Sequence, residues 1–124
     1  MIRARLLFRF GTVGLLASLL HYAAAAAALL GDLPPLTANL LGFCCAFAAG
    51  FLGHHRFTFQ QRKQGAWKPL LRYSAVSCGG FAGSQILLDA LTASAGLPAL
   101  AALLLAMGAA AALSFLLSSL WAFA

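Results

Sequence analysis

Residues 50–59 read Gly50-Phe51-Leu52-Gly53-His54-His55-Arg56-Phe57-Thr58-Phe59, an aromatic and basic stretch that follows a long apolar run. A weaker copy closes the chain, where residues 114–123 read Ser114-Phe115-Leu116-Leu117-Ser118-Ser119-Leu120-Trp121-Ala122-Phe123. When the two stretches are aligned with a shift of 64 positions, four large residues coincide: Phe51 with Phe115, Leu52 with Leu116, Phe57 with Trp121 and Phe59 with Phe123. The segments that lead into these stretches also begin alike, because Phe8-Arg9-Phe10 is matched by Leu71-Arg72-Tyr73. The sequence therefore predicts two similar halves.

The composition is that of an integral membrane protein. Of the 124 residues, 63% are hydrophobic and 8% are charged, whereas about a quarter of the residues of a soluble domain are charged. The apolar residues come in long unbroken runs, and too few charges remain to cover a water-facing surface. The length predicts a single domain over residues 1–124.

Four apolar runs are long enough to cross a bilayer as helices. We expect transmembrane helices at about residues 8–30, 37–57, 70–93 and 99–121. Turns rich in glycine and proline at residues 31–35 and 96–98 end the first and third helices. The N-terminus has some features of a signal peptide, but its apolar run is long enough to span a bilayer and its opening recurs at residue 71. The predicted fold is all-α, with four transmembrane helices forming two two-helix repeats.

The basic residues predict the orientation in the membrane. All of them lie in the N-terminal segment or around the hydrophilic segment 60–69: Arg3, Arg5, Arg9, Arg56, Arg62, Lys63, Lys68 and Arg72. Because loops rich in Lys and Arg stay on the cytoplasmic side, both termini and this segment are predicted to be cytoplasmic. The repeats then have parallel rather than inverted topology. The basic residues lie only beside the apolar spans, and no motif that reads a nucleic-acid groove accompanies them, so nucleic acid is not expected as a partner.

Small residues suggest where helices pack closely. Ala38, Gly42, Ala46 and Gly50 recur every four residues and form one narrow strip on the second helix. Gly79-x-x-x-Gly83 gives a similar signal on the third helix. Three cysteines lie inside apolar runs without metal-ligand spacing, so we expect packed thiols at Cys44, Cys45 and Cys78.

Several short motifs recur in a known family. They are Arg9-Phe10-x-x-Val13-Gly14, Ala38-Asn39 at the start of the second helix, the stretch from Phe51 to Phe59, Arg72-Tyr73, and the final Ser-x-x-Trp-x-Phe pattern. With these motifs, nearly the whole chain resembles the GtrA-like family. The resemblance implies a small four-helix protein of a bacterial-type cytoplasmic membrane, linked to cell-surface polysaccharide or teichoic acid modification. It also implies translocation of a polyprenyl-phosphate-linked sugar, or of the lipid carrier phosphate, beside a polyprenyl-phosphate glycosyltransferase.

One motif departs from the family pattern. Members usually carry Asn-Phe-x-x-Asn-Arg at the end of the second helix. Here the two asparagines and the arginine are replaced by Gly50, His54 and His55. Arg56 is left as the permanent cation of this segment.

Polar residues are expected at two levels of the bilayer. The inner level consists of Arg9, His54, His55, Arg56 and Arg72. A guanidinium group offers a fork of donors that suits phosphate oxygens, so this level is the candidate site for the lipid phosphate. Arginines at such positions also commonly anchor helix ends at the interface, and both interpretations stay open.

The outer level consists of His21, Asn39, Gln85 and Asp89. At a rise of about 1.5 Å per residue, His21 lies about 20 Å from the inner interface. Polar groups in hydrocarbon tend to face a cavity or each other, so these residues are candidates for a polar groove that a sugar passes along. Alternatively, Asn39 and Asp89 are interfacial and His21 bonds a neighbouring helix.

No enzymatic, metal-binding or cofactor-binding arrangement stands out. The two carboxylates, Asp32 and Asp89, belong to different segments. The main alternative function is a scaffold subunit that docks and stabilises a membrane glycosyltransferase, with the strip on the second helix as its docking face. A homo-oligomer and a purely structural membrane protein are also compatible with the sequence. A proton-coupled exporter of lipophilic cations is disfavoured, because the first helix lacks a carboxylate.

Overall fold

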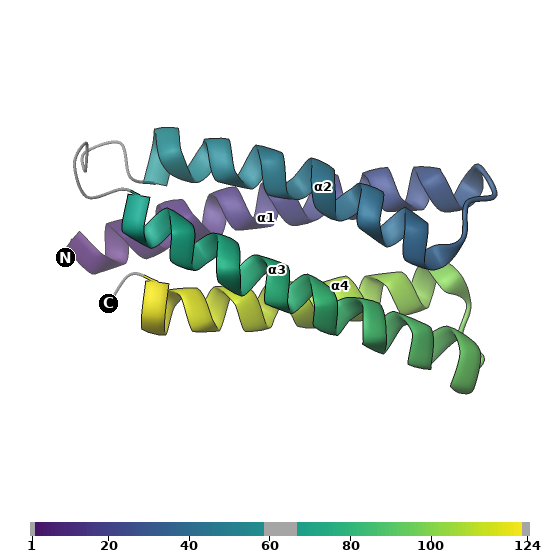
Figure 1. Ribbon diagram of the computed structural model, residues 1–124. Coiled ribbons are helices and arrows are strands. Elements are labelled where there is room, and N and C mark those ends of the chain that lie inside the picture. Colours follow the sequence, from purple (N-terminus) through teal and green to yellow (C-terminus); the bar gives the residue numbers. More distant parts are fainter. Residues whose placement is uncertain (1, 59–66, 123–124) are drawn as a thin grey trace.

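A computed structural model describes residues 2–58 and 67–122 as a helical bundle (Figure 1). In these residues the chain forms four long helices, α1 (Ile2–Leu30), α2 (Pro35–Gly53), α3 (Trp67–Asp89) and α4 (Ala99–Leu117). Three of the helices continue into short π-helical segments, η1 (His54–Thr58), η2 (Ala90–Ser94) and η3 (Ser118–Ala122). The predicted all-α fold is confirmed.

The helix boundaries differ from the predicted ones at the N-terminal ends. α1 begins at Ile2, because no proline or glycine interrupts the basic segment before Phe10. α2 begins at Pro35 and α3 includes Pro69 in its first turn, where the missing N–H of a proline has no helical partner to lose. Phe59, Phe123 and most of the hydrophilic segment 60–69 lie outside the described residues.

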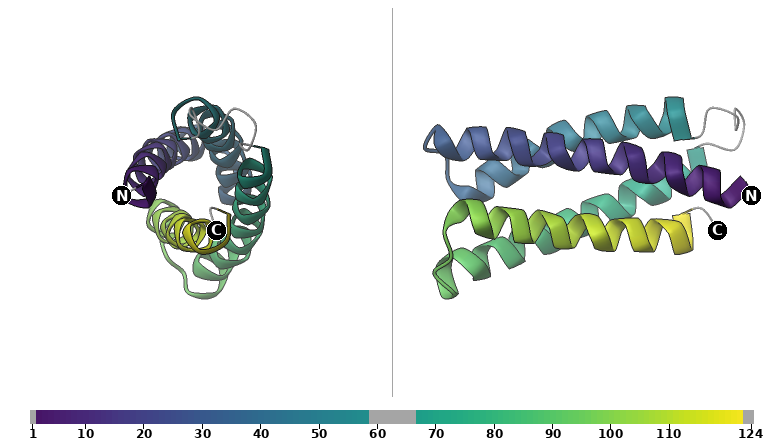
Figure 2. Two further views of the ribbon diagram at one scale, coloured as in Figure 1. Left: turned by 90° about the vertical axis from the view of Figure 1, so that its left-hand side faces the viewer. Right: turned by 180° about the vertical axis from the view of Figure 1, so that it is seen from behind.

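The helices are arranged so that equivalent helices run in the same direction. α1 and α3 run one way along the bundle, and α2 and α4 return (Figure 1). Seen along the bundle, the helices follow one another in chain order, and α4 packs against α1 to close the ring (Figure 2). The starts of α1 and α3 and the segments η1 and η3 lie at one end, which we call the basic end. The turns that contain Asp32 and Gly96 lie at the other, which we call the turn end.

The backbone repeats between the two halves. Asp32 and Gly96 both adopt positive φ values, 67° and 69°. Two residues later, a proline precedes the next helix in each half. Pro34 before α2 has φ −59° and ψ 148°, and Pro98 before α4 has φ −57° and ψ 144°. The predicted two-repeat organisation, with parallel topology, is therefore confirmed. The cytoplasmic placement of the basic end remains a prediction from charge.

The surface of the bundle suits a lipid environment. Spans within α1, within α2 with η1, and within α4 are long and apolar enough to cross a membrane. α3 carries more polar residues, yet it runs the length of the bundle between α2 and α4 (Figures 1 and 2). Large apolar side chains point outward, such as Leu15 at 63% exposure and Ile86 at 74%. The interior combines a few large apolar side chains, such as Leu70, Leu88 and Leu103, with many small and polar ones, as is typical of helices that pack closely in a membrane.

The strip of small residues on α2 lies inside the bundle. Ala38, Gly42, Ala46 and Gly50 are all buried. A Cβ atom added at Gly42 would lie 2.5 Å from the backbone oxygen of His21, and one added at Gly50 would lie 2.7 Å from the Tyr73 hydroxyl. The strip packs against α1 and α3, so its predicted use as a docking face for another protein was wrong.

Two other predictions about packing were also wrong. Cβ atoms added at Gly79 and Gly83 would meet nothing within 4 Å, and both residues line an apolar groove of about 450 Å³ between α3 and α4. The close approach is at Gly80, where a Cβ would lie 2.8 Å from the Ser114 hydroxyl. Cys44, Cys45 and Cys78 are exposed rather than packed, because they lie on the outward faces of α2 and α3.

Candidate functional site

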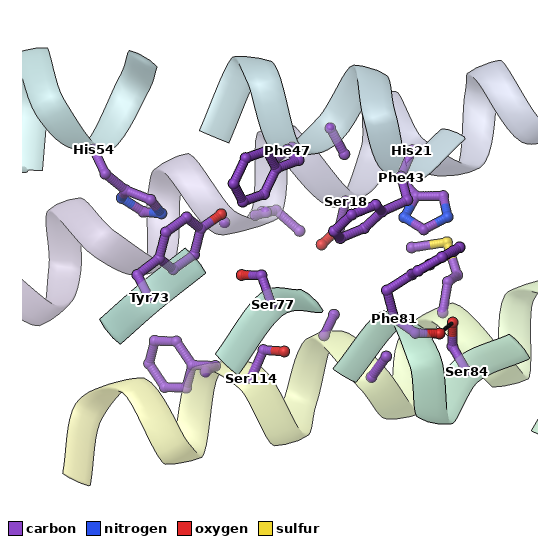
Figure 3. A pocket seen from close by; sticks show the side chains of 18 of the residues that line it. Ser18, His21, Phe43, Phe47, His54, Tyr73, Ser77, Phe81, Ser84 and Ser114 are labelled. Carbon is purple, nitrogen blue, oxygen red and sulfur yellow. Dashed lines mark hydrogen bonds between the residues drawn. The ribbon is translucent and has the colours of Figure 1, made fainter. Parts of the chain in front are cut away.

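A cavity of about 360 Å³ lies in the middle of the bundle, between the two halves. All four helices contribute to its lining (Figure 3). α1 supplies mainly small residues, whereas α2 and α3 supply aromatic rings and α4 supplies small and apolar side chains. These residues include Gly11, Gly14, Ala17, Ser18, Phe43, Phe47, Ser77, Phe81, Met107, Ala110 and Ser114. None of the described residues that line the cavity is an Arg, Lys, Asp or Glu.

Four rings close the cavity toward the basic end. Phe10 of α1 stacks on His54 with 4.6 Å between ring centroids and on Phe115 with 5.4 Å. Tyr73 of α3 meets His54 edge-on at 4.5 Å and Phe10 at 6.0 Å. The layer joins the two halves, because Phe10 and His54 come from the first half and Tyr73 and Phe115 from the second.

His54 belongs to this layer and not to an exposed inner rim, where the sequence analysis placed it. Its side chain is 1% exposed, and its Nδ1 atom shares a hydrogen bond of 2.9 Å with the Thr58 hydroxyl. The Nε2 atom is buried without a hydrogen-bond partner among the described residues. The ring reaches from η1 toward the cavity (Figure 3). The equivalent position in the second half, Ser118, also carries a buried hydroxyl without a partner among the described residues.

A hydrogen-bond network closes the cavity toward the turn end. His21 Nε2 donates to Asn39 Oδ1 at 2.8 Å, and Asn39 Nδ2 lies 3.0 Å from both Ser84 Oγ and Gln85 Oε1. Gln85 Nε2 then donates to the Leu36 carbonyl at 3.1 Å. The network joins α1 and α2 to α3, so three of the four predicted outer-level residues do lie together.

Ser84 is a member of this network that the sequence analysis missed. A serine in a helix is a weak signal by itself, but Ser84 occupies the position in the second repeat that His21 occupies in the first. The repeat was the signal by which it could have been found. Asp89 lies outside the network and is exposed at the end of α3.

Arg9 and Arg72 make equivalent contacts in the two halves. The Arg9 guanidinium lies 5.2 Å from the centre of the Phe57 ring and donates to the Phe57 carbonyl at 3.4 Å. The Arg72 guanidinium lies 5.1 Å from the centre of the Trp121 ring and donates to the Trp121 carbonyl at 3.1 Å. Each arginine thus binds the end of the partner helix in its own half. Because a guanidinium has five N–H donors, these contacts leave donors for a further acceptor.

The remaining residues of the predicted inner level are exposed. The His55 ring lies 6.1 Å from that of Trp67, and Arg56 makes no hydrogen bond or ion pair with the described part of the chain. The structure therefore places the predicted cations around the basic end without gathering them into one cluster. Among the described residues no three His, Cys, Asp or Glu side chains are grouped to hold a metal ion.

The arrangement offers two chemically distinct environments. The cavity presents rings, hydroxyl groups and two imidazoles, with no Arg, Lys, Asp or Glu among its described lining residues, while cations lie at the basic end. Such a site suits an amphiphile with a neutral polar part and an anionic part.

Comparison with known proteins identifies the family of the chain. The profile of the GtrA/DPMS transmembrane domain matches residues 9–123, which agrees with the resemblance seen in the sequence. Comparison with curated proteins and with solved structures gave no match. Because the matched region covers almost the entire chain, the protein belongs to the GtrA/DPMS transmembrane-domain family, whose members are membrane proteins of polysaccharide and glycolipid synthesis.

Proposed function

We propose that the protein translocates a polyprenyl-phosphate-linked sugar, or the lipid carrier phosphate, across the cytoplasmic membrane during cell-surface polysaccharide synthesis. It does so without making or breaking covalent bonds. The observation that carries this proposal is the hydroxyl-lined and ring-lined cavity between the two halves, which has no Arg, Lys, Asp or Glu among its described lining residues, with cations at the basic end. The lipid tail stays in the bilayer, against the outward-facing leucines.

The arginines at the basic end are the proposed contacts for the lipid phosphate. Arg9 and Arg72 are partly exposed and are held in place by the rings and carbonyls they contact. Phosphate oxygens accept well from a guanidinium fork. The anchoring role and the phosphate-binding role are compatible, because an anchored guanidinium is already oriented for its ligand.

Both walls of the cavity are contacts between the two halves. At the basic end, Phe10 packs against Tyr73 and Phe115, and at the turn end Asn39 bonds Ser84 and Gln85. Rocking of one half against the other would open one wall while the other stays closed, as in transporters with internal repeats. We propose that movement runs down a gradient set by synthesis of the lipid on one side and its consumption on the other.

The test is transbilayer movement of a fluorescent polyprenyl-phosphate hexose in liposomes that contain the purified protein. Arg72→Ala should weaken binding of the lipid by about ten- to a hundredfold, because a charge-assisted contact is worth about 1.5–3 kcal/mol. Arg72→Lys should restore part of the binding, since it keeps the charge but loses the fork. Arg5→Ala removes an exposed arginine one turn before Arg9 and serves as the control.

The alternative function is a scaffold for a polyprenyl-phosphate glycosyltransferase. The strip on α2 is buried, so a docking enzyme would have to use another surface. Movement no faster than in empty liposomes, together with capture of the glycosyltransferase by the same preparation, would favour the scaffold over translocation.

A further inference from the structure

We infer that the central cavity is the binding site of the sugar itself, that it takes one uncharged monosaccharide ring, and that His54 Nε2 contacts a sugar hydroxyl. This inference rests on the proposed function, since it names the part of the substrate that the cavity holds. It assigns the phosphate and the sugar to different places, the phosphate to the basic end and the sugar to the middle of the bundle.

Aromatic rings give the cavity an apolar wall, and their edges and outer faces, which are not stacked on one another, are the surfaces that a sugar ring would contact. Phe43 and Phe81 stack with 4.4 Å between centroids, and Phe47 lies parallel to Tyr73 at 6.4 Å. These rings come from α2 and α3 and lie along the cavity (Figure 3). Ligand pockets commonly combine such apolar walls with a few placed polar groups that fix the orientation of the ligand.

The polar groups of the cavity match the hydroxyl groups of a sugar. Ser18, Ser77 and Ser114 line the same space from three different helices (Figure 3). A serine hydroxyl both donates and accepts, as a sugar hydroxyl does. The site therefore carries polar groups on several sides instead of on one face.

His54 supplies the strongest indication of a missing ligand. Buried polar atoms almost always have a hydrogen-bond partner, and Nε2 of this residue has none among the described residues. The bond between Nδ1 and the Thr58 hydroxyl is compatible with either tautomer of the ring. Nε2 is therefore either a donor or an acceptor, and a sugar hydroxyl satisfies both forms. A phosphate oxygen would satisfy only the donor form.

The charge and size of the cavity limit which sugar it takes. A buried carboxylate, phosphate or ammonium group needs an opposite charge, and the described lining residues include no Arg, Lys, Asp or Glu to supply one. The volume of about 360 Å³ is at the small end of the range for ligand pockets, roughly 300–1,000 Å³. It suits a single ring better than an oligosaccharide.

The experiment is isothermal titration calorimetry of the purified protein with three short-chain polyprenyl phosphates. One carries no sugar, one a neutral hexose and one a hexuronic acid. We expect the hexose lipid to bind at least about tenfold more tightly than the other two, the factor for one well-made hydrogen bond. His54→Ala should remove this preference while leaving the affinity for the bare lipid phosphate unchanged, and Leu52→Ala, on the exposed face of α2, is its control.

A second pair of variants tests the site without touching the histidine. Ser77→Leu fills the cavity, whereas Cys78→Leu places the same side chain on the exposed face of α3. Loss of the hexose preference in Ser77→Leu alone supports the site. Equal affinities of the wild-type protein for all three lipids, or tight binding of the hexuronic acid lipid, would overturn it. A protein that prefers the hexose lipid yet moves no lipid in liposomes would retain this site while refuting translocation.

Discussion

The first and second halves of the bundle share a backbone but differ in the polarity of equivalent side chains. Asn39 of α2 corresponds to Leu103 of α4, and both are completely buried. His54 of η1 corresponds to Ser118 of η3, and both are buried as well. The repeated backbone thus determines which positions are inside, whereas the chemistry at those positions has diverged. A site with a defined orientation can arise in this way from two similar halves.

The halves also interlock through equivalent hydrogen bonds. Gln85 Nε2 of α3 donates to the Leu36 carbonyl at the start of α2. The Tyr22 hydroxyl of α1 lies 3.4 Å from the Leu100 carbonyl at the start of α4 and donates to it. Each bond joins the first helix of one half to the second helix of the other at the turn end. Opening this end requires both bonds to break.

The largest expected effect is on thiol labelling, because the two turns should both be accessible from one side of the membrane only. In a variant without native cysteines, Asp32→Cys and Ala95→Cys should react only with an impermeant thiol reagent added from outside, because the two turns are equivalent. Gln64→Cys should react only from the cytoplasmic side, as the basic residues predict. Labelling of one turn from each side would contradict the parallel repeat, and labelling of Gln64→Cys from outside would reverse the orientation.

The next largest effect concerns a close contact that only the first half makes. Gly42→Ala should destabilise the protein by about 1–3 kcal/mol, the range for overpacking, because its Cβ would lie 2.5 Å from the His21 backbone oxygen. The second half has Ala106 at the equivalent position and tolerates the methyl group. Thermal unfolding in detergent measures the difference. Gly83→Ala, which meets nothing within 4 Å, is the matched control and should not destabilise.

A smaller effect on stability is expected when the two halves are given the same side chain at positions 39 and 103, which are equivalent but hold Asn39 and Leu103. Asn39→Leu should lower the free energy of unfolding by about 0.6–2 kcal/mol, the range for an interhelical hydrogen bond in a membrane. Leu103→Asn in the same chain should restore part of the loss, since the repeat predicts Ser84 and His21 as the partners of an amide at this equivalent position. If the double variant is less stable than Asn39→Leu in thermal unfolding, the equivalence of the two halves does not extend to this network.

The smallest effect is expected at the two arginines. Arg9→Gln and Arg72→Gln, which remove the cation from the ring, should each reduce the free energy of unfolding by about 0.5–1 kcal/mol, the value of an exposed cation–π contact. Because both guanidinium groups make the same pair of contacts, the two losses should be equal within error. A large loss for one arginine alone, measured in the same unfolding assay, would show that the two helix ends are held differently.

The fold followed from the sequence because apolar runs, proline turns and basic flanks are local signals. The repeat was visible for the same reason, since Phe51 and Phe115 lie in segments that can be aligned by eye. The direction in which side chains point was not a local signal. His54 and His55 are adjacent and chemically identical, yet one is buried against Phe10 and the other is exposed. Only the packing of η1 against α1 separates them.

The residues that line the cavity were equally hard to predict from the sequence. Ser77 and Ser114 are ordinary residues in apolar helices, and nothing in their spacing indicates that they face the same space. The strip on α2 was recognised, but its partner was not, because small residues permit a close approach without specifying which helix makes it. The contact of Gly42 with His21 needed the three-dimensional structure.

The central claim is that a lipid-linked sugar crosses the membrane through the cavity between the halves. The most direct measurement compares transbilayer movement of a polyprenyl-phosphate hexose in liposomes that contain the wild-type protein, Ser77→Leu or Cys78→Leu. We expect movement by the wild type and Cys78→Leu at similar rates, and movement by Ser77→Leu no faster than in empty liposomes. A folded Ser77→Leu protein that moves the lipid as fast as the wild type would contradict this claim.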